Sequence, residues 1–294
     1  MTPRDRDDPG RLRRFFRDLW RIARTDKGAM AGGIIILIYC VVAIIGPVFA
    51  HVGNMSPADA YLPPSFKHLL GTDSLGQGVF SQLIIGTRPI MEIGIAAAVM
   101  TVFVGVVVGL ITGYLGGLVD SVVMRITDVF LTIPGLPLII VVASIIHTSS
   151  PLVLAAILSL TAWAGLARAV RSQAMSLRGS DFLEAARLQG MPLRNVVGRQ
   201  LLPNVGPYVA IHFLLDVTGA IYAAVGLFLL GVAPISGSNW GVMISLAMSQ
   251  GAMYTTKSML YLFAPMAAIV ILQMSFVFFS RALDRVFNPR LRVQ

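Results

Sequence analysis

The chain has 294 residues, of which 56% are hydrophobic and only 13% are charged, and its mean hydropathy is +0.78. One soluble core cannot bury this much apolar surface, so the composition excludes an ordinary water-soluble protein and predicts that lipid surrounds most of the chain. The net charge is +9, and the single cysteine excludes an intrachain disulfide.

Six segments without charge are each close to the ~20 residues that a helix needs to cross ~30 Å of hydrocarbon. The expected spans are residues 29–50, 93–118, 129–147, 152–166, 205–230 and 259–280. The first is long enough to span a bilayer and lacks a clear cleavage site, so we expect an anchor helix and not a cleaved signal peptide. The sequence therefore predicts an all-α integral membrane protein with six transmembrane helices.

Prolines and small polar residues mark breaks between the third and fourth spans. Residues 147–151 (His-Thr-Ser-Ser-Pro) divide a long uncharged stretch and predict a tight hairpin outside the membrane. Pro134 and Pro137 remove backbone donors near the start of the third span, so that helix should be kinked or begin late.

Charge predicts the orientation. If both termini are cytoplasmic, 20 lysines and arginines lie inside, and only Lys67, Arg88 and Lys257 lie outside. The expected divisions are a basic cytoplasmic segment at 1–28, an anchor helix at 29–50, an external loop at 51–88, a core at 89–280 with a cytoplasmic loop at 167–203, and a cytoplasmic tail at 281–294. Apolar residues between the N-terminal arginines favour a membrane-surface helix over a nucleic-acid-binding tail.

The cytoplasmic loop contains signals for one short helix. Asp181 and Glu184 have the spacing of a capping box, which predicts that the helix begins there. Gly190 can adopt the left-handed conformation that ends a helix, so the helix should be about 12 Å long. A second helical pattern follows and should end at Pro203.

The same short helix has the features of a docking surface. Ala185 and Ala186 would let another protein approach closely, and Glu184 offers a fixed negative charge. An amphipathic connector lying on the membrane surface explains the spacing equally well. The pattern alone leaves both interpretations open.

Four other features carry expectations. Asp216 is the one acid deep inside a span, and His212 lies one turn earlier; the pair lines a pathway, forms a buried structural pair, or takes up a proton. Glycines at mostly four-residue spacing predict close packing, within the subunit or against another one; they are Gly105, Gly109, Gly113, Gly116 and Gly117. Arg88 and Glu92 predict a weak interfacial ion pair. Trp240 predicts a headgroup-level anchor or a short helix dipping toward the membrane.

Catalytic motifs are absent from the sequence. A phosphate-binding loop needs Gly-Lys-Ser/Thr, and none of the three lysines follows a glycine. The four histidines are scattered, which makes a metal site improbable. We therefore expect a chain that is not an enzyme and holds no cofactor.

Several separated motifs identify a family that this chain resembles. Glu184-Ala185-Ala186, Gly190 and Leu202-Pro203 look like the EAA signature of permease subunits in binding-protein-dependent ABC importers. In that family this loop is the coupling helix, seated in a cleft of the ATPase subunit. The resemblance thus assigns ATPase coupling to these residues and to Asp181 and Arg187 beside them.

Further motifs resemble those of the second, C-type permease of dipeptide and oligopeptide importers. They are the N-terminal anchor, Gly-Thr-Asp-x-Leu-Gly at 71–76, the set Asp120, Met124, Arg125 and Asp128, and Ser-x-Trp-Gly at 238–241. Members commonly follow Leu-Gly with Arg-Asp and later place an arginine after serine, where this chain has Gln77-Gly78 and Ser81-Gln82. We expect these departures to lie where cargo or its binding protein touches, so an importer of haem or of a metal chelate stays open.

The resemblance implies a type I ABC importer permease fold in a bacterial inner membrane. It also implies a homologous B-type permease as partner, ATPase subunits that bind ATP and Mg²⁺, and a solute-binding protein that docks outside. Asp73 and Trp240 are the outer docking candidates, and His212 and Asp216 the pathway candidates. The rivals are an ion-coupled secondary transporter that uses Asp216 and an intramembrane enzyme that uses Asp216 with His212.

Overall fold

The computed structural model describes residues 26–233, 238–252 and 258–287. Its elements in chain order are α2 (Lys27–Phe49), η2 (Pro57–Asp59), α3 (Val79–Leu115), α4 (Gly117–Thr132), α5 (Gly135–Ile146), α6 (Pro151–Leu177), α7 (Asp181–Leu188), α8 (Leu193–Asn195), the π-helix η3 (Val196–Leu201), α9 (Leu202–Leu229), α10 (Trp240–Ser249) and α11 (Met259–Phe287). The described residues form no β-sheet, which confirms the expected all-α fold. Residues 1–25 of the basic segment lie outside the described residues, as do residues 288–294 of the tail.

Five helices are long and apolar enough to cross a membrane, and a sixth span results if α4 and α5 count as one broken helix. These two helices meet at a bend of 83°. The break falls at Pro134, which precedes α5, so the expected kink is confirmed. The hairpin before α6 is also confirmed, since His147 has the left-handed φ of 44° and α6 begins at Pro151.

Three helices extend beyond the charge-free segments. The second span begins at Val79 and not at residue 93, so α3 includes the last residues of the loop expected at 51–88. Likewise, α6 continues to Leu177 and α11 to Phe287. Charged residues mark the edge of the hydrocarbon, but a helix satisfies its own backbone and continues past that edge. The predicted Arg88–Glu92 pair forms on α3, with 2.7 Å between Nε and Oε1, and both side chains are exposed.

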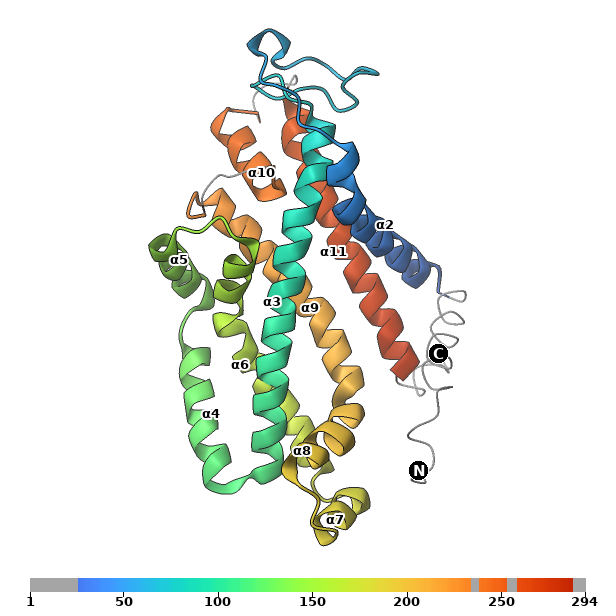
Figure 1. Cartoon of the computed structure of the whole chain (residues 1–294), viewed down its shortest axis with the longest axis vertical. Helices are drawn as coiled ribbons and strands as arrows, with labels where there is room; N and C mark the ends of the chain where they lie inside the picture. The colour runs from blue at the N-terminus through green and yellow to red at the C-terminus, as the bar shows by residue number, and fades with distance from the viewer. Residues whose placement is uncertain (1–25, 234–237, 253–257, 288–294) are drawn as a thin grey trace.

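Helix α3 runs through the centre of the bundle, with α6, α9 and α2 packed against it (Figure 1). Helix α2 lies along α11, and α4 and α5 flank α6. The loop before α3 caps one end of the bundle, and α7 lies at the opposite end. The molecule therefore offers one loop surface at each end of its apolar bundle.

Glycines allow α3 and α6 to touch through their backbones. A Cβ on Gly109 would lie 2.6 Å from the carbonyl oxygen of Ala167, and one on Gly113 would lie 2.6 Å from the Cβ of Ala174. The predicted packing is confirmed for this part of the repeat, and it lies within the subunit. Gly116 and Gly117 have φ of 65° and 61° and make the turn into α4. A Cβ on Gly116 would lie 2.5 Å from Nη1 of Arg178, whereas one on Gly117 would meet no atom within 4 Å, so the packing expectation is wrong for Gly117.

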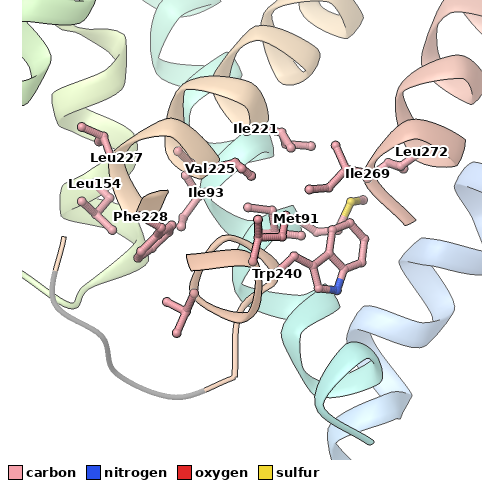
Figure 2. Packing of buried hydrophobic residues seen from close by; sticks show 14 of the residues in the cluster. Met91, Ile93, Leu154, Ile221, Val225, Leu227, Phe228, Trp240, Ile269 and Leu272 are labelled. Atoms are coloured by element: carbon pink, nitrogen blue, oxygen red, sulfur yellow. The ribbon is translucent and has the colours of Figure 1, made fainter. Parts of the chain in front are cut away.

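Trp240 lies in the main hydrophobic core (Figure 2). Its side chain is fully buried, and its indole Nε1 donates to the carbonyl oxygen of Leu83 at 2.9 Å. The ring of Tyr39 packs edge-on against the indole ring, with 5.7 Å between the ring centres. The headgroup anchor is therefore wrong, because the indole hydrogen bond is satisfied by α3 and not by lipid. The alternative of a short helix is confirmed in α10.

Candidate functional site

The N-cap residue of α7 lies one position earlier than the sequence pattern suggests. Ser180 is the N-cap residue, and its carbonyl oxygen accepts from the amides of Leu183 and Glu184 at 3.0 and 3.1 Å. Asp181 and Glu184 lie in the first helical turn, so the capping box is wrong. Their carboxylates still stabilise the helix, because negative charge is attracted to the partial positive charge at a helix N-terminus.

The C-terminal end of α7 is a Schellman turn, as the glycine predicted. Gly190 has a φ of 63°, and its amide donates to the carbonyl oxygen of Arg187 at 3.0 Å. The amide of Met191 reaches back to Ala186 at 3.1 Å. The loop is thereby turned sharply after two helical turns.

One face of α7 is buried in a small core of its own, here called the coupling cluster. Its buried members are Val106, Leu110, Leu166, Val170, Ala174, Leu183, Ala186, Val196, Leu201 and Val205. They come from α3, α6, α7, η3 and α9. Leu183 is fully buried and Ala186 is 3% exposed, so the expectation that Ala186 offers a docking surface is wrong. The inner face of the helix is therefore packed onto the bundle.

The other face of α7 is exposed and carries acids beside an apolar side chain. Asp181, Glu184 and Ala185 are exposed, and Leu188 is 85% exposed. Neither acid forms an ion pair within the described residues. Arg187 turns away from this face, and its guanidinium lies 5.2 Å from the centre of the Tyr114 ring of α3.

The helix that follows α7 does not end at Pro203 as expected. It passes from α8 through η3 into α9, and Pro203 lies in the first turn of α9. The amide of Leu202 donates to Val197, five residues back. This wider π-helical turn provides the local adjustment that lets a helix pass a proline, which has no N–H and clashes with the carbonyl four residues earlier. Leu202 and Pro203 are both exposed.

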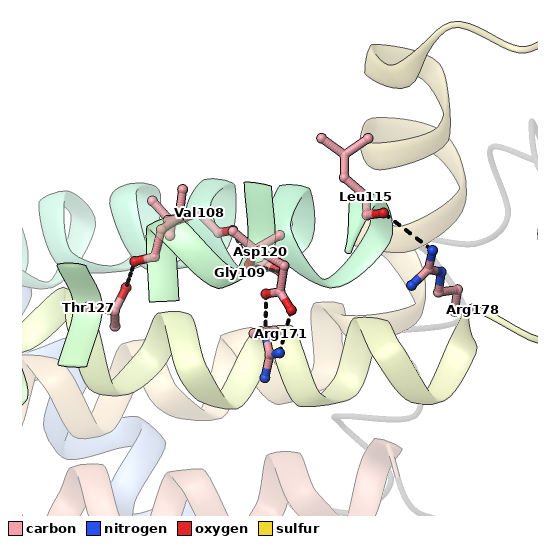
Figure 3. A network of polar contacts seen from close by, with 9 residues as sticks. Val108, Gly109, Leu115, Asp120, Thr127, Arg171 and Arg178 are labelled. Carbon is pink, nitrogen blue, oxygen red and sulfur yellow. Dashed lines mark hydrogen bonds and ion pairs between the residues drawn. The ribbon is translucent and has the colours of Figure 1, made fainter. Parts of the chain in front are cut away.

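Acids of α4 bind arginines of α6 (Figure 3). Asp120 takes both Nε and Nη2 of Arg171 at 2.5 Å, and the pair is partly buried. Asp128 binds Arg168, and Arg178 donates to the carbonyl oxygen of Leu115 at 3.3 Å. The acids quoted as a family motif therefore brace α4 against α6 with charge-assisted bonds, a role that the sequence did not reveal.

Asp73 organises the loop before α3 from inside. It is 3% exposed, and its Oδ1 accepts from the amides of Leu75 and Gln77 at 2.9 and 2.8 Å. Its Oδ2 accepts from Nε2 of Gln82 at 2.7 Å. Asp73 and Trp240 are both buried, so neither is an outer docking residue and that expectation is wrong. Gln82 is buried too, so this one departure from the family pattern makes an internal contact with Asp73.

The exposed part of this loop is apolar. Phe66 is fully exposed beside Lys67, and Leu69 and Met55 are more than half exposed. Two hydrogen bonds of the Thr72 hydroxyl hold the loop in shape. The hydroxyl donates to the carbonyl oxygen of Asp59 at 2.5 Å and accepts from the backbone amide of Leu62 at 2.8 Å. The loop therefore presents an aromatic side chain at the end of the molecule opposite α7.

His212 and Asp216 do not form the expected pair. The His212 ring stacks on Tyr208, with 4.4 Å between ring centres. The Oδ2 atom of Asp216 is buried and has no hydrogen bond within the described residues. Nowhere in the described part of the chain do three or more His, Cys, Asp or Glu side chains form a group that could hold a metal ion.

Family models match nearly the whole chain. The family described as binding-protein-dependent transport system inner membrane component matches residues 105–293. The chain belongs to this family. A model of the N-terminal TM domain of oligopeptide transport permease C matches residues 14–64 of the same permease.

Named relatives cover most of the permease. It is 33% identical over 234 residues to the dipeptide transport system permease protein DppC of Bacillus subtilis (strain 168), covering 78% of this chain and 72% of that protein. It is 30% identical over 283 residues to the oligopeptide transport system permease protein OppC of the same strain, covering 93% and 90%. The OppC protein of Lactococcus lactis subsp. cremoris (strain SK11) is 30% identical over 272 residues, covering 91% and 92%.

The permease is a multi-pass protein of the bacterial inner membrane and a transport subunit of an ABC importer. Its family works with ATPase and binding-protein partners. The functional features that sequence reasoning missed are the exposed Leu188, the pairing of Asp120 with Arg171, and the exposed Phe66. The repeated acid and arginine spacing on α4 and α6 was a usable signal for the second of these, since opposite charges in apolar helices seek each other.

Proposed function

We propose that this permease forms half of the translocation path of an ATP-driven peptide importer, paired with a homologous B-type permease. The cargo assignment is supported by the relatives, which are named as dipeptide and oligopeptide permeases. Peptides are proposed over haem or a metal chelate on the names of these relatives; of the departures that kept those cargoes open, the one at Gln82 is a buried contact with Asp73.

The observation that carries the proposal is the two-sided character of α7. Its inner face is part of the coupling cluster, whereas its outer face exposes Glu184, Ala185 and Leu188. We propose that the outer face seats in a cleft of the ATPase subunit on the cytoplasmic side. When the ATPases close on ATP, α7 moves, and Leu183 transmits the motion to α3 and α6 because the packed cluster cannot deform freely.

The permease contributes shape and coupling and makes no bonds of its own. Its partner subunits hold ATP and Mg²⁺, and the chain lacks a Gly-Lys-Ser/Thr loop. The braces from Asp120 and Asp128 keep α4 on α6 as the path switches between inward-facing and outward-facing states. Both termini lie in the cytoplasm, in keeping with the excess of basic residues assigned to that side.

On the outside, a solute-binding protein delivers the cargo. We assign its contact on this subunit to Phe66 and Leu69, because exposed aromatic and apolar side chains are enriched at protein interfaces. Asp73 holds the shape of this contact from below.

The test is uptake by proteoliposomes that contain both permeases and the ATPases, with the solute-binding protein outside. Labelled di- and tripeptides should accumulate with ATP and without any ion gradient, and excess haem should not compete. Uptake driven by an ion gradient without ATP would support a secondary transporter and refute the proposal. Turnover of peptide by the purified permease alone would support an intramembrane enzyme.

A further inference from the structure

Asp216 is a carboxylate in the middle of an apolar helix. It lies about 21 Å from the first residue of α9 and about 20 Å from the last, at 1.5 Å per residue. Its Oδ2 atom is buried without a hydrogen bond, and the ion pairs of the described residues all lie elsewhere. A carboxylate at this depth is costly unless it faces water or a partner. The carboxyl group is therefore neutralised by a proton, solvated by water, or bound by a group from outside the described residues.

The position of Asp216 on α9 points to the uncovered side of that helix. Val217, the next residue, is buried in the main core, where α9 packs on α3 and α11. One turn away from Asp216, Gly219 is exposed, and an added Cβ there would meet no atom within 4 Å. Tyr222, about one turn further, is half exposed. Asp216 thus borders an exposed side of α9 that includes Gly219, Tyr222 and the 44%-exposed Leu215.

The nearest candidate partner within the subunit, His212, does not bind the carboxylate. His212 lies one turn from Asp216, but its ring stacks on Tyr208 and makes no hydrogen bond to the carboxylate. A carboxylate with free acceptor positions binds a cation through charge-assisted hydrogen bonds. The open side at Gly219 leaves room for an ammonium group to approach, and such a group is present at the amino terminus of every unmodified peptide.

We propose that Asp216 is a binding site for the amino-terminal ammonium group of the peptide as it passes through the permease. The proposal rests on the proposed function, since it needs a peptide cargo. During passage, the ammonium donates to Oδ2 and replaces the water that it loses on leaving the binding protein. Asp216 is then a specificity-determining residue that favours peptides with a free amino terminus.

The test compares two tripeptides of one sequence without basic side chains, one with a free and one with an acetylated amino terminus. Uptake is measured in the complete reconstituted importer, at concentrations that saturate the binding protein with each peptide. Asp216→Asn should lower uptake of the free peptide roughly tenfold to a hundredfold, the usual effect of losing a hydrogen bond between charged groups. Uptake of the acetylated peptide should keep its wild-type rate. Asp216→Glu should retain the preference.

The matched control is Glu92→Gln, which neutralises an exposed acid paired with Arg88 and should change neither peptide selectively. Equal loss for both peptides would overturn the proposal, because it indicates a structural role or a bond to a basic residue of the partner permease. No loss for either would overturn it as well. If the wild-type importer shows no ATP-dependent uptake of either peptide, the proposed function itself has failed.

A second measurement does not require the binding protein to accept an acetylated peptide. A tripeptide with a diazirine in its first side chain should label α9 within about one turn of Asp216 in the wild-type importer. Asp216→Asn should abolish that labelling, whereas Glu92→Gln should retain it. Labelling that is unchanged by Asp216→Asn, or that maps to other helices only, contradicts the assignment.

Discussion

Two leucines of α7 separate docking from packing in one short helix. Leu188 is 85% exposed and Leu183 is fully buried. Burying a leucine side chain is worth about 1.5–3 kcal/mol, so if Leu188 enters the ATPase cleft, Leu188→Ala should weaken ATPase binding by about 30-fold, equivalent to about 2 kcal/mol. The thermal stability of the permease should hardly change, because the side chain touches little within the chain. Leu183→Ala should instead destabilise the permease by about 2–5 kcal/mol, as core truncations do.

The assay is equilibrium binding of the purified ATPase subunit to the permease pair in lipid nanodiscs, followed by peptide uptake and ATP consumption in proteoliposomes. Leu118→Ala is the matched control, because Leu118 is 84% exposed at the start of α4 but lies outside α7. The reasoning is refuted if Leu188→Ala binds the ATPase within about twofold of the wild type, a change worth only ~0.4 kcal/mol. It is also refuted if Leu118→Ala weakens binding equally.

Other substitutions test the packing, the brace and the outer contact. Gly109→Ala places a Cβ against the α6 backbone and should lower the unfolding temperature, since overpacking costs about 1–3 kcal/mol. Gly165→Ala faces open space and should leave the unfolding temperature equal or higher. The reverse order in a melting experiment contradicts the close packing of α3 on α6. Arg171→Gln leaves the partly buried Asp120 unpaired and should cost about 3 kcal/mol in denaturant unfolding; an unchanged midpoint argues against a brace. Phe66→Ala should raise the binding-protein concentration that half-saturates ATPase stimulation about tenfold with unchanged basal hydrolysis; an unaltered titration places the contact elsewhere.

The membrane spans were largely predictable because the bilayer imposes one rule on every residue. Charge-free runs of sufficient length located all the long helices, and Pro134 located the bend between α4 and α5. Helix ends were not predictable in the same way. Val79 begins α3 well outside the charge-free run, because a helix satisfies its own backbone and therefore extends beyond the hydrocarbon edge.

Side-chain direction was the main source of error in the candidate site. Asp73 and Trp240 lie in loops that the sequence places outside the membrane, which suggested exposed contacts. Asp73 faces inward because three donors from its own loop and from α3 surround it, and Trp240 because the carbonyl oxygen of Leu83 accepts its indole hydrogen. The partner of Trp240 is far away in sequence, so no local pattern reveals it. The donors to Asp73 are local, and the turn that they form is one that an Asp side chain commonly makes with its own backbone.

The amino-acid sequence by itself determined the solvent of each segment, the two-turn length of α7 and the family, because hydropathy, glycine conformation and motif spacing are properties of short stretches. Only the tertiary structure decided which face of α7 is free, that Asp120 belongs to Arg171, and that Oδ2 of Asp216 has no hydrogen-bond partner among the described residues. Each of these depends on residues brought together from separate helices. Packing and charge pairing act through space, and the order of residues along the chain does not specify which surfaces remain uncovered once the helices have packed.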